Sequence, residues 1–258
     1  MIKRILHRIK YKLIDLELNL KRKIGIQTST LKLKSGELFR IRNNDNLGIS
    51  VLKGEDFEEA TQYEIMSRIR ENMTVLDIGA NIGYYTVQMA TKVGPHGKVI
   101  AFEPSPIIWE ELQYNVSLNK LDNVILNKTA LSNINGYGSF CLPQTGYDAH
   151  ASLKPNKTFD VSKLIEVKTE RLDDVLCGLG VSDIGFIKID VEGAERDVFE
   201  GAVKLLSAKQ RPVIIFESAE HLCQPFGHCV FDVLYYLYKY DYTVEQFDYG
   251  MWRAIPKK

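Results

Sequence analysis

From residue 72 onward, short apolar segments alternate with helical segments, and this alternation constrains the fold more than any other feature of the chain. The apolar segments are residues 74–79, 98–104, 123–132, 184–190, 212–218, 242–248 and 251–256. Apolar runs separated by helical patterns indicate parallel strands joined by helical crossovers, with helices on both faces of the sheet. We therefore predict an α/β fold with a mostly parallel seven-stranded sheet, in which the last two segments form an antiparallel pair.

The residues before this alternation follow other patterns. Residues 28–43 alternate apolar and polar side chains on either side of Ser35-Gly36, which predicts a β-hairpin. Residues 55–71 predict a helix. We accordingly divide the chain into an N-terminal helix at 1–24, a hairpin and helix at 25–71, and the sheet-containing domain at 72–258.

The first segment has the pattern of a basic amphipathic helix. Seven apolar residues share one helical face, namely Ile2, Ile5, Leu6, Ile9, Leu13, Leu16 and Leu20. Residues 1–24 also hold eight Lys or Arg against Asp15 and Glu17, a net charge of +6. Such a face usually packs on its own domain or on a second subunit, which would make a homodimer contact. Peripheral contact with an anionic membrane surface is the alternative.

The charge balance and the cysteines limit partners and compartment. Thirty-three basic residues balance thirty-three acidic ones, so the chain lacks the overall positive field of a general nucleic-acid binder, and we expect no nucleic-acid partner. The four cysteines form no C-x-x-C motif, which favours a reducing compartment. We expect a cytoplasmic protein, with a membrane-peripheral location if the N-terminal helix binds lipid.

Acidic residues follow the first two predicted strands, where a parallel sheet binds its ligands. The first strand leads into Asp77-Ile78-Gly79-Ala80-Asn81-Ile82-Gly83, which lacks the G-x-G-x-x-G pattern of dinucleotide-binding proteins. A carboxylate here repels a pyrophosphate but suits an ammonium group. Glu103 comes twenty residues after Gly83, where an acid accepts ribose hydroxyls. These residues together favour S-adenosylmethionine over NAD, although two helix-capping acids would give the same pattern.

At this point a resemblance to a known family becomes clear. VLDIGANIGYYTVQMA, VIAFEPSP, ALS, RLDDV, IKIDVEGAE and PVIIFE occur in this order over about residues 74–217. This series resembles the FkbM family of S-adenosylmethionine-dependent methyltransferases, and IKIDVEGAE is its most specific member. The resemblance implies a Rossmann-like class I methyltransferase fold for the domain at 72–258, and O-methylation, often of a sugar or polyketide hydroxyl.

The resemblance also assigns cofactor contacts by position. It implies that the methionine end of the cofactor is lined by Asp77, Gly79, Asn81 and Gly83, with Tyr85 or the neighbouring Tyr84 as a further contact. Glu103 would hold the ribose. The Thr129-Ala130 step would border the adenine, and Asp190 would bind the cofactor's amino group or orient the acceptor.

An alcohol has a pKa far above neutrality, so its methylation needs a base or a metal ion that takes up or displaces the proton. The candidate bases are Asp190, Glu192 and His221. With Glu217, the first two also give three carboxylates at one rim, which could hold Mg²⁺. Lys188 interrupts an apolar strand and needs a buried partner, for which Asp77 and Asp190 are the candidates.

We therefore expect an S-adenosylmethionine-dependent O-methyltransferase whose acceptor is a small molecule or glycan, such as a sugar or a secondary metabolite. A non-catalytic binding protein with the same fold is one alternative. A methyltransferase acting on a protein or nucleic acid is another. Residues 133–164 predict an insertion at the sheet edge, where His150, with Tyr147 and Asp148, could touch the acceptor or lie in a plain surface loop.

Overall fold

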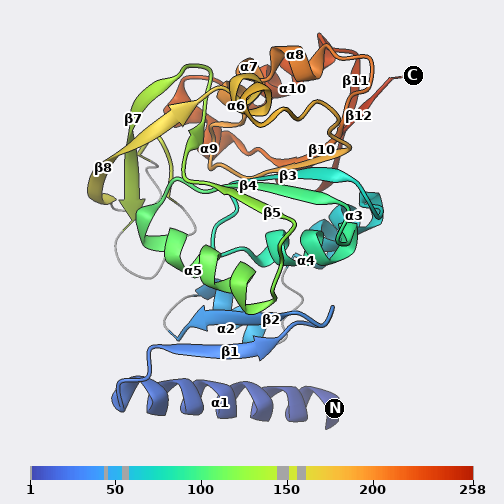
Figure 1. Cartoon of the computed structure of the whole chain (residues 1–258). Coiled ribbons are helices and arrows are strands. Elements are labelled where there is room, and N and C mark those ends of the chain that lie inside the picture. The colour runs from blue at the N-terminus through green and yellow to red at the C-terminus, as the bar shows by residue number, and fades with distance from the viewer. Residues whose placement is uncertain (1, 44–45, 54–57, 144–150, 156–160, 258) are drawn as a thin grey trace.

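The computed structural model describes residues 2–43, 46–53, 58–143, 151–155 and 161–257. In this part of the chain the main sheet has seven strands (Figure 1). Their spatial order is β11 (Tyr242–Asp248), β12 (Met251–Pro256), β10 (Val213–Glu217), β9 (Phe186–Ile189), β3 (Thr74–Ile78), β4 (Lys98–Phe102) and β5 (Val124–Asn127).

The strands from β10 to β5 are parallel, and β12 is antiparallel to both β10 and β11. The predicted mostly parallel sheet and its antiparallel final pair are therefore confirmed. The chain runs outward from β3 through β4 to β5 and then returns to β9 on the other side of β3. The strand order thus reverses between β3 and β9, the position where open parallel sheets bind their ligands.

Helices cover both faces of this sheet, as the alternation predicts (Figure 1). One face carries α6 (Leu172–Leu179), α7 (Glu195–Glu200), α8 (Val203–Leu206) and α10 (Val230–Tyr238). The other carries α3 (Glu59–Arg68), α4 (Tyr84–Val93) and α5 (Pro106–Leu118). After β10 the chain continues through α9 (Glu220–Cys223) and a short 3-10 turn, η2 (Gln224–Phe226). The helix predicted over 55–71 corresponds to α3.

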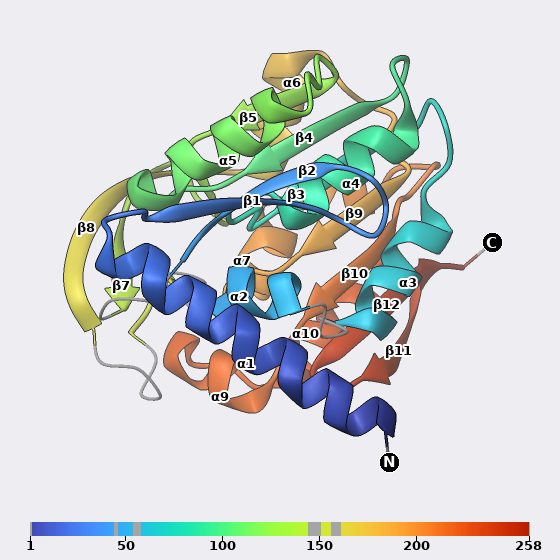
Figure 2. The same ribbon diagram turned by 90° about the horizontal axis from the view of Figure 1, so that it is seen from below.

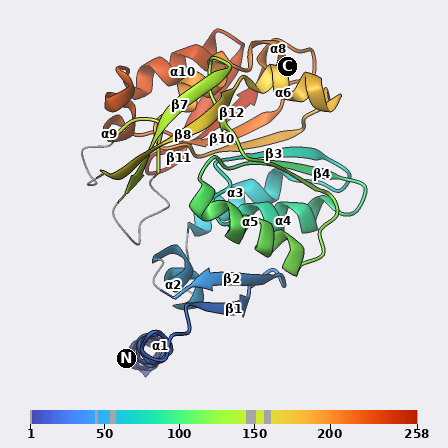
Figure 3. The same ribbon diagram turned by 60° about the vertical axis from the view of Figure 1, so that its left-hand side comes forward.

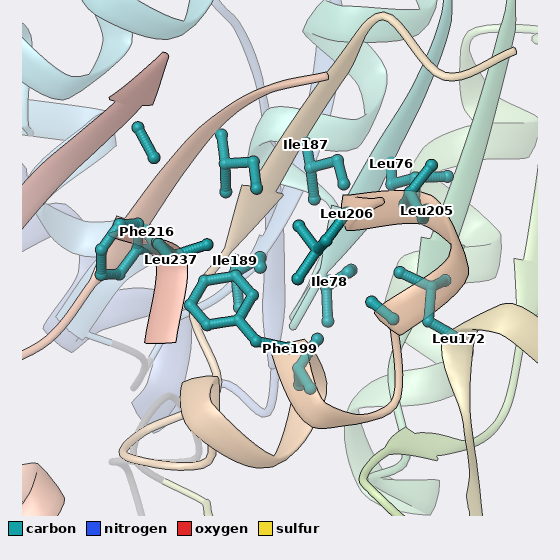
Figure 4. Packing of buried hydrophobic residues seen from close by; sticks show 14 of the residues in the cluster. Leu76, Ile78, Leu172, Ile187, Ile189, Phe199, Leu205, Leu206, Phe216 and Leu237 are labelled. Atoms are coloured by element: carbon teal, nitrogen blue, oxygen red, sulfur yellow. The ribbon is translucent and has the colours of Figure 1, made fainter. Parts of the chain in front are cut away.

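The largest core cluster lies between the sheet and the helices α6, α7, α8 and α10 (Figure 4). Successive strand residues point to opposite faces, so Leu76 and Ile78 of β3 share this side with Ile187 and Ile189 of β9. Phe199 of α7 packs edge-on against a phenylalanine of β10, with ring centroids 5.5 Å apart. Each fully buried side chain of this kind stabilises the fold by roughly 1.5–3 kcal/mol.

A second, three-stranded sheet stands beside the carboxyl ends of the main strands, seen edge-on at the left of Figure 1 and nearer the viewer in Figure 3. It contains β6 (Ala130–Leu131), β8 (Val161–Glu170) and β7 (Gly136–Pro143) in this order. A single strand over 123–132 is therefore wrong, because the segment divides between two sheets. Thr129 lies between β5 and β6, and its hydroxyl donates to the carbonyl of Lys168 in β8 at 3.0 Å.

The predicted hairpin over 28–43 is confirmed as β1 (Thr28–Lys32) paired antiparallel with β2 (Leu38–Arg42). It packs on the outer side of α5 (Figure 1), where the Arg40 guanidinium lies 2.8 Å from the Glu111 carboxylate. Phe39 shares a buried cluster with Leu112. The hairpin therefore shares a core with the sheet-containing domain. A short helix, α2 (Asn46–Lys53), follows it.

Helix α1 (Ile2–Lys23) forms the outermost layer, on the far side of the hairpin from the main sheet (Figures 1 and 2). The side chain of Leu18 in α1 is buried. The Lys53 ammonium of α2 lies 2.9 Å from the Asp15 carboxylate, and the Lys21 ammonium donates to the Ser29 hydroxyl at 3.1 Å. None of the helices in the described ranges combines the length and apolar composition needed to cross a bilayer.

Candidate functional site

A cavity of about 610 Å³, counted out to its open mouth, lies where the strand order reverses. Its polar lining comes from the turns after β3, β4 and β9, and its apolar lining from α5 and the second sheet. The predicted residues among its walls are Gly79, Asn81, Glu103, Thr129, Ala130, Asp190 and Glu192.

The turn after β3 brings backbone close to the end of β9. Gly79 has φ +78°, and a Cβ there would stand 1.8 Å from the carbonyl oxygen of Asp190, so a side chain cannot be accommodated. Asn81 also has a positive φ, of 50°, and its N–H donates to Glu103 Oε2 at 2.9 Å. The glycine thus lets two neighbouring turns meet at the base of the cavity.

Glu103 is the buried carboxyl of the cavity, with 6% of its surface exposed. Its second oxygen, Oε1, accepts a hydrogen bond from the Ser105 N–H at 2.8 Å. Burial raises the pKa of Glu103 to about 7, although the two backbone N–H donors oppose this shift. Since each carboxylate oxygen can accept more than one hydrogen bond, Glu103 can still receive two ligand hydroxyls.

Asp77 lies beneath the cavity rather than in its wall. It is fully buried and directly opposite Lys188 in the pairing of β3 with β9. The Lys188 ammonium lies 3.5 Å from Asp77 Oδ1 and 3.3 Å from Asp190 Oδ2, and it donates to the Gly79 carbonyl at 2.8 Å. Burial lowers the pKa of Lys188, but Asp190 and Asp77 outweigh it and the net shift is upward. A charged lysine therefore connects both turns of the site.

The apolar side of the cavity suits a flat ring. Phe102 and Ile108 line it from β4 and α5, together with Ala130 of β6. Phe140 of β7 and Leu153 complete this wall. The sequence analysis missed the last two, because they lie in the segment expected to be an edge insertion.

Glu195 shapes the turn after β9. Its Oε1 accepts hydrogen bonds from the N–H groups of Val191 and Gly193, at 3.3 and 3.1 Å. Burial raises the pKa of Glu195 to about 8. Glu192 within this turn has φ 56°, and its carbonyl accepts a bond from the Ser152 hydroxyl at 2.9 Å. Glu195 is the last residue of the IKIDVEGAE motif. The sequence alone does not show that its side chain contacts this turn, because that depends on where α7 begins.

Asp190, Glu192 and Glu217 form a cluster of carboxyl groups, called here the carboxyl trio. One oxygen from each lies within 4.8 Å of the others, and among the described residues this is the one group of three with a metal-like arrangement. Burial and, to a smaller extent, the negative charges of Asp190 and Glu192 together raise the pKa of Glu217 to about 10. Without a cation, Glu217 therefore carries a proton at neutral pH.

Besides Asp77, the predicted residues Gly83, Tyr85 and His221 do not line this cavity. Gly83 is the N-cap of α4. The Tyr85 hydroxyl donates to Glu58 Oε2 at 2.6 Å, and the Tyr85 ring centroid lies 5.6 Å from the Lys188 ammonium. His221 is exposed on α9 and lines a separate open groove with Tyr249 and Trp252 among others.

Glu58 joins this network from the N-terminal part of the chain and was not predicted. A single glutamate between a helix and a loop gives no signal in the sequence. Tyr147, Asp148 and His150 lie outside the described residues.

Comparison with curated proteins finds several methyltransferases. "Methyltransferase sdnD" of Sordaria araneosa is 29% identical over 170 residues, which cover 54% of this chain and 63% of that protein. "2-O-methyltransferase NoeI" of Sinorhizobium fredii is 31% identical over 148 residues (52% and 58%). "31-O-demethyl-FK506 methyltransferase FkbM" of Streptomyces tacrolimicus is 28% identical over 159 residues (52% and 60%). The chain thus spans about three fifths of the length of these relatives.

Among solved structures, a SAM-dependent methyltransferase from Aquifex aeolicus matches 77% of this chain and 88% of its own, with a TM-score of 0.44 and 16% identity. Fibrillarin from Aeropyrum pernix, solved with natively bound S-adenosyl-L-methionine, matches 89% and 94%, with a TM-score of 0.46 and 12% identity. The family model described as "Methyltransferase FkbM domain" matches residues 77–244. Because this match spans more than half of the chain, the protein belongs to the FkbM methyltransferase domain family.

Proposed function

We propose that the chain is an S-adenosylmethionine-dependent O-methyltransferase acting on a hydroxyl group of a sugar, glycan or secondary metabolite. One observation carries the proposal: a single cavity holds the buried carboxyl of Glu103 and, beside it, the carboxyl groups of Asp190 and Glu192. Two relatives, a 2-O-methyltransferase and a 31-O-demethyl-FK506 methyltransferase, have names that specify oxygen as the methylated atom, which supports the choice.

The residues of the cavity fit this cofactor. Glu103 would accept hydrogen bonds from the two ribose hydroxyls, and the wall of Phe102, Ile108 and Leu153 would cover the adenine. Asp190, whose Oδ2 lies 3.3 Å from the Lys188 ammonium, would attract the amino group of the methionine end. When bound, S-adenosylmethionine supplies a methyl group on a positively charged sulfur that an oxygen can attack.

Glu192 is the member of the carboxyl trio that we assign as the base. Asp190 is engaged with Lys188, and Glu217 carries a proton at neutral pH because burial raises its pKa to about 10. Glu192 lines the cavity and would take the proton of the acceptor hydroxyl as the new C–O bond forms and the C–S bond breaks. The protein otherwise accelerates the transfer by holding oxygen, methyl carbon and sulfur in line.

A divalent cation at the carboxyl trio is the alternative way to lower the pKa of the hydroxyl. The trio offers three oxygens within 4.8 Å, which suits Mg²⁺, and its binding would displace the proton of Glu217. The two versions differ in one simple test. Activity that survives treatment with EDTA supports Glu192 as the base, and activity lost with EDTA and restored by Mg²⁺ supports the cation.

The acceptor would enter through the open groove beyond β10. The groove begins at Ser218, next to Glu217, and is lined by Trp252, by His221 and by Tyr249, which is 87% exposed. Aromatic side chains with polar neighbours suit the faces and hydroxyls of sugars. His221 would then orient the acceptor, and its replacement by Gln would raise KM and leave the pH–rate profile unchanged.

Transfer of radiolabelled methyl groups from S-adenosylmethionine into sugar, glycolipid and small-molecule extracts tests the proposal. We expect label in one of these fractions, and a loss of about 10²–10⁴-fold in Glu192→Gln, as is typical when a general base is removed. The surface variant Glu110→Gln is the matched control. Label that enters only protein or nucleic acid would overturn the proposed acceptor class, and full activity in Glu192→Gln would overturn the assigned base.

A further inference from the structure

Helix α1 contacts the rest of the molecule through one side, which carries apolar residues and two polar contacts. Asp15 contacts Lys53 of α2, and Lys21 contacts Ser29 of β1. On the same side Leu18 is buried, with 1% exposure, and Ile14 is half-buried. The remaining circumference of the helix faces away from the hairpin (Figures 1 and 3).

The outward side of α1 is apolar. Its described residues, called here the α1 stripe, are Ile9, Leu13, Leu16 and Leu20, and their exposures lie between 49% and 66%. Their spacing places them in one row along the helix. Ile24, just after the helix, is 64% exposed as well. The expected burial of this face against its own domain is therefore not what the structure shows for these residues.

A contiguous exposed apolar row on a helix marks a surface that binds something. The charged residues beside the α1 stripe indicate what kind of partner this surface binds. Lys12 and Lys23 border the stripe at helical spacing, and residues 1–24 carry a net charge of +6. The two acidic residues of this segment contact cations of the protein itself, Asp15 with Lys53 and Glu17 with Lys21 at 2.6 Å. The surface around the stripe is thus positive.

We propose that α1 docks on an anionic membrane surface, with the α1 stripe in the boundary between headgroups and acyl chains. An apolar stripe bordered by lysines is the pattern of helices that lie in this interface, and each lysine near an anionic leaflet adds attraction. A second copy of the chain fits less well, because stripe-to-stripe contact would bring two segments of charge +6 together. This inference does not depend on the methylation reaction.

Co-sedimentation of the full-length chain with vesicles tests the proposal. We expect binding to vesicles of phosphatidylcholine mixed with phosphatidylglycerol, and at least about tenfold weaker binding to phosphatidylcholine alone. Binding should also weaken when NaCl shortens the Debye length to about 3 Å. The protein remaining in the supernatant with anionic vesicles at low salt would overturn the proposal.

Two matched double variants separate the stripe from apolar surface in general. Leu13→Glu/Leu20→Glu should reduce vesicle binding at least about tenfold, because it places carboxylates at positions that would enter the membrane. Ile134→Glu/Leu164→Glu changes two residues of similar exposure elsewhere (both 62%, against 60% and 59%) and adds the same charge. This control should bind vesicles with less than about a threefold loss. Equal losses in both variants would mean that charge alone is responsible and would contradict the role of the stripe.

A third variant and one further measurement complete the test. Lys12→Gln/Lys23→Gln should bind anionic vesicles more weakly while keeping the residual binding to phosphatidylcholine. Sedimentation equilibrium of the wild type gives the remaining outcome. A dimer that Leu13→Glu/Leu20→Glu dissociates, together with no vesicle binding, would overturn the membrane proposal and assign the stripe to a second copy.

Discussion

The two faces of the main sheet differ at neighbouring residues of the same strands. On the side of α7 and α8, β3 and β9 present Leu76, Ile78 and Ile187 to an apolar core (Figure 4). On the side of α4, a second apolar cluster is interrupted by Asp77 and Lys188, which the same strands present as a buried ion pair. An apolar pair of similar volume would stabilise this position at least as well, so stability alone does not explain the charges.

The difference assigns separate tasks to the two faces. The apolar face stabilises the sheet by burial, which is insensitive to direction. The ion pair also determines the relative position of neighbouring segments, because the Lys188 ammonium donates to the Gly79 carbonyl and contacts Asp190. Lys188 thus holds the turns after β3 and β9 at a fixed separation beneath the cavity.

Removing the charge of the lysine should have the largest effect. Lys188→Met leaves the Asp77 carboxylate buried without its cation, and we expect a loss of about 3–5 kcal/mol in the free energy of unfolding. Affinity for S-adenosylhomocysteine should fall at least about tenfold, because Gly79 and Asp190 lose their common contact. Urea unfolding and calorimetric titration measure the two effects.

The double variant Asp77→Leu/Lys188→Met sharpens this test. Stability should return toward the wild-type value, because no unpaired charge is left buried, while cofactor affinity stays low. Recovery of both would mean that the pair does not position the site.

On the apolar face, Leu76→Ala should cost about 2–5 kcal/mol of stability, through lost burial and the cavity it leaves. Leu76 is fully buried and lies next to Asp77 in the chain. The folded fraction should nevertheless bind S-adenosylhomocysteine with less than about a threefold change. A larger change, measured by titration well below the unfolding temperature, would break the division between the two faces.

At the carboxyl trio, Glu217→Gln should stabilise the protein at pH 8 by about 1–2 kcal/mol. Burial raises the pKa of Glu217 from 4.5 to about 10, so its neutral form contributes stability that is present below pH 4.5 and lost as the pH rises toward 10. The amide does not titrate, so variant and wild type should be equally stable near pH 4.5 and diverge above it. Thermal unfolding in EDTA at both pH values measures this. Destabilisation at pH 8 would contradict a protonated Glu217.

The smallest effect concerns the pH dependence of cofactor binding. Since the pKa of Glu103 is raised to about 7 in the free protein and ribose hydroxyls need its ionised form, binding below pH 7 requires loss of a proton. Affinity for S-adenosylhomocysteine should fall by up to about tenfold per pH unit below pH 7 and level off above it. Calorimetry between pH 5.5 and about 8 shows this slope in the wild type. A flat profile would mean that Glu103 does not contact the ligand.

Strand ends and their acidic residues could be predicted from the sequence because they depend on local pattern. The positions of Glu103 and Asp190 follow from where an apolar run stops, and both line the cavity. The position of Asp77 depends on something else. The sequence predicts Asp77 and Asp190 as candidate partners of Lys188, and the register of β3 with β9 places Asp77 opposite it.

The division of residues 123–132 between two sheets could not be predicted for a similar reason. Apolar residues stand on both sides of Asn127-Lys128-Thr129 in this segment, and nothing in it shows that Ala130 pairs with Thr169 of β8. That pairing places Phe140 and Leu153 against the cavity. The sequence also could not show that the α1 stripe faces away from the rest of the molecule. Helical periodicity shows that a helix has an apolar side, but it does not show what that side faces.

Calorimetric titration of the full-length protein with S-adenosylhomocysteine at pH 8 tests the central claim most directly. We expect micromolar binding, a loss of about 10-fold or more in Glu103→Gln through the missing charge-assisted hydrogen bonds, and unchanged binding in Glu110→Gln. No binding by the folded wild type, or equal binding by Glu103→Gln, would contradict the assignment of this cavity to the cofactor.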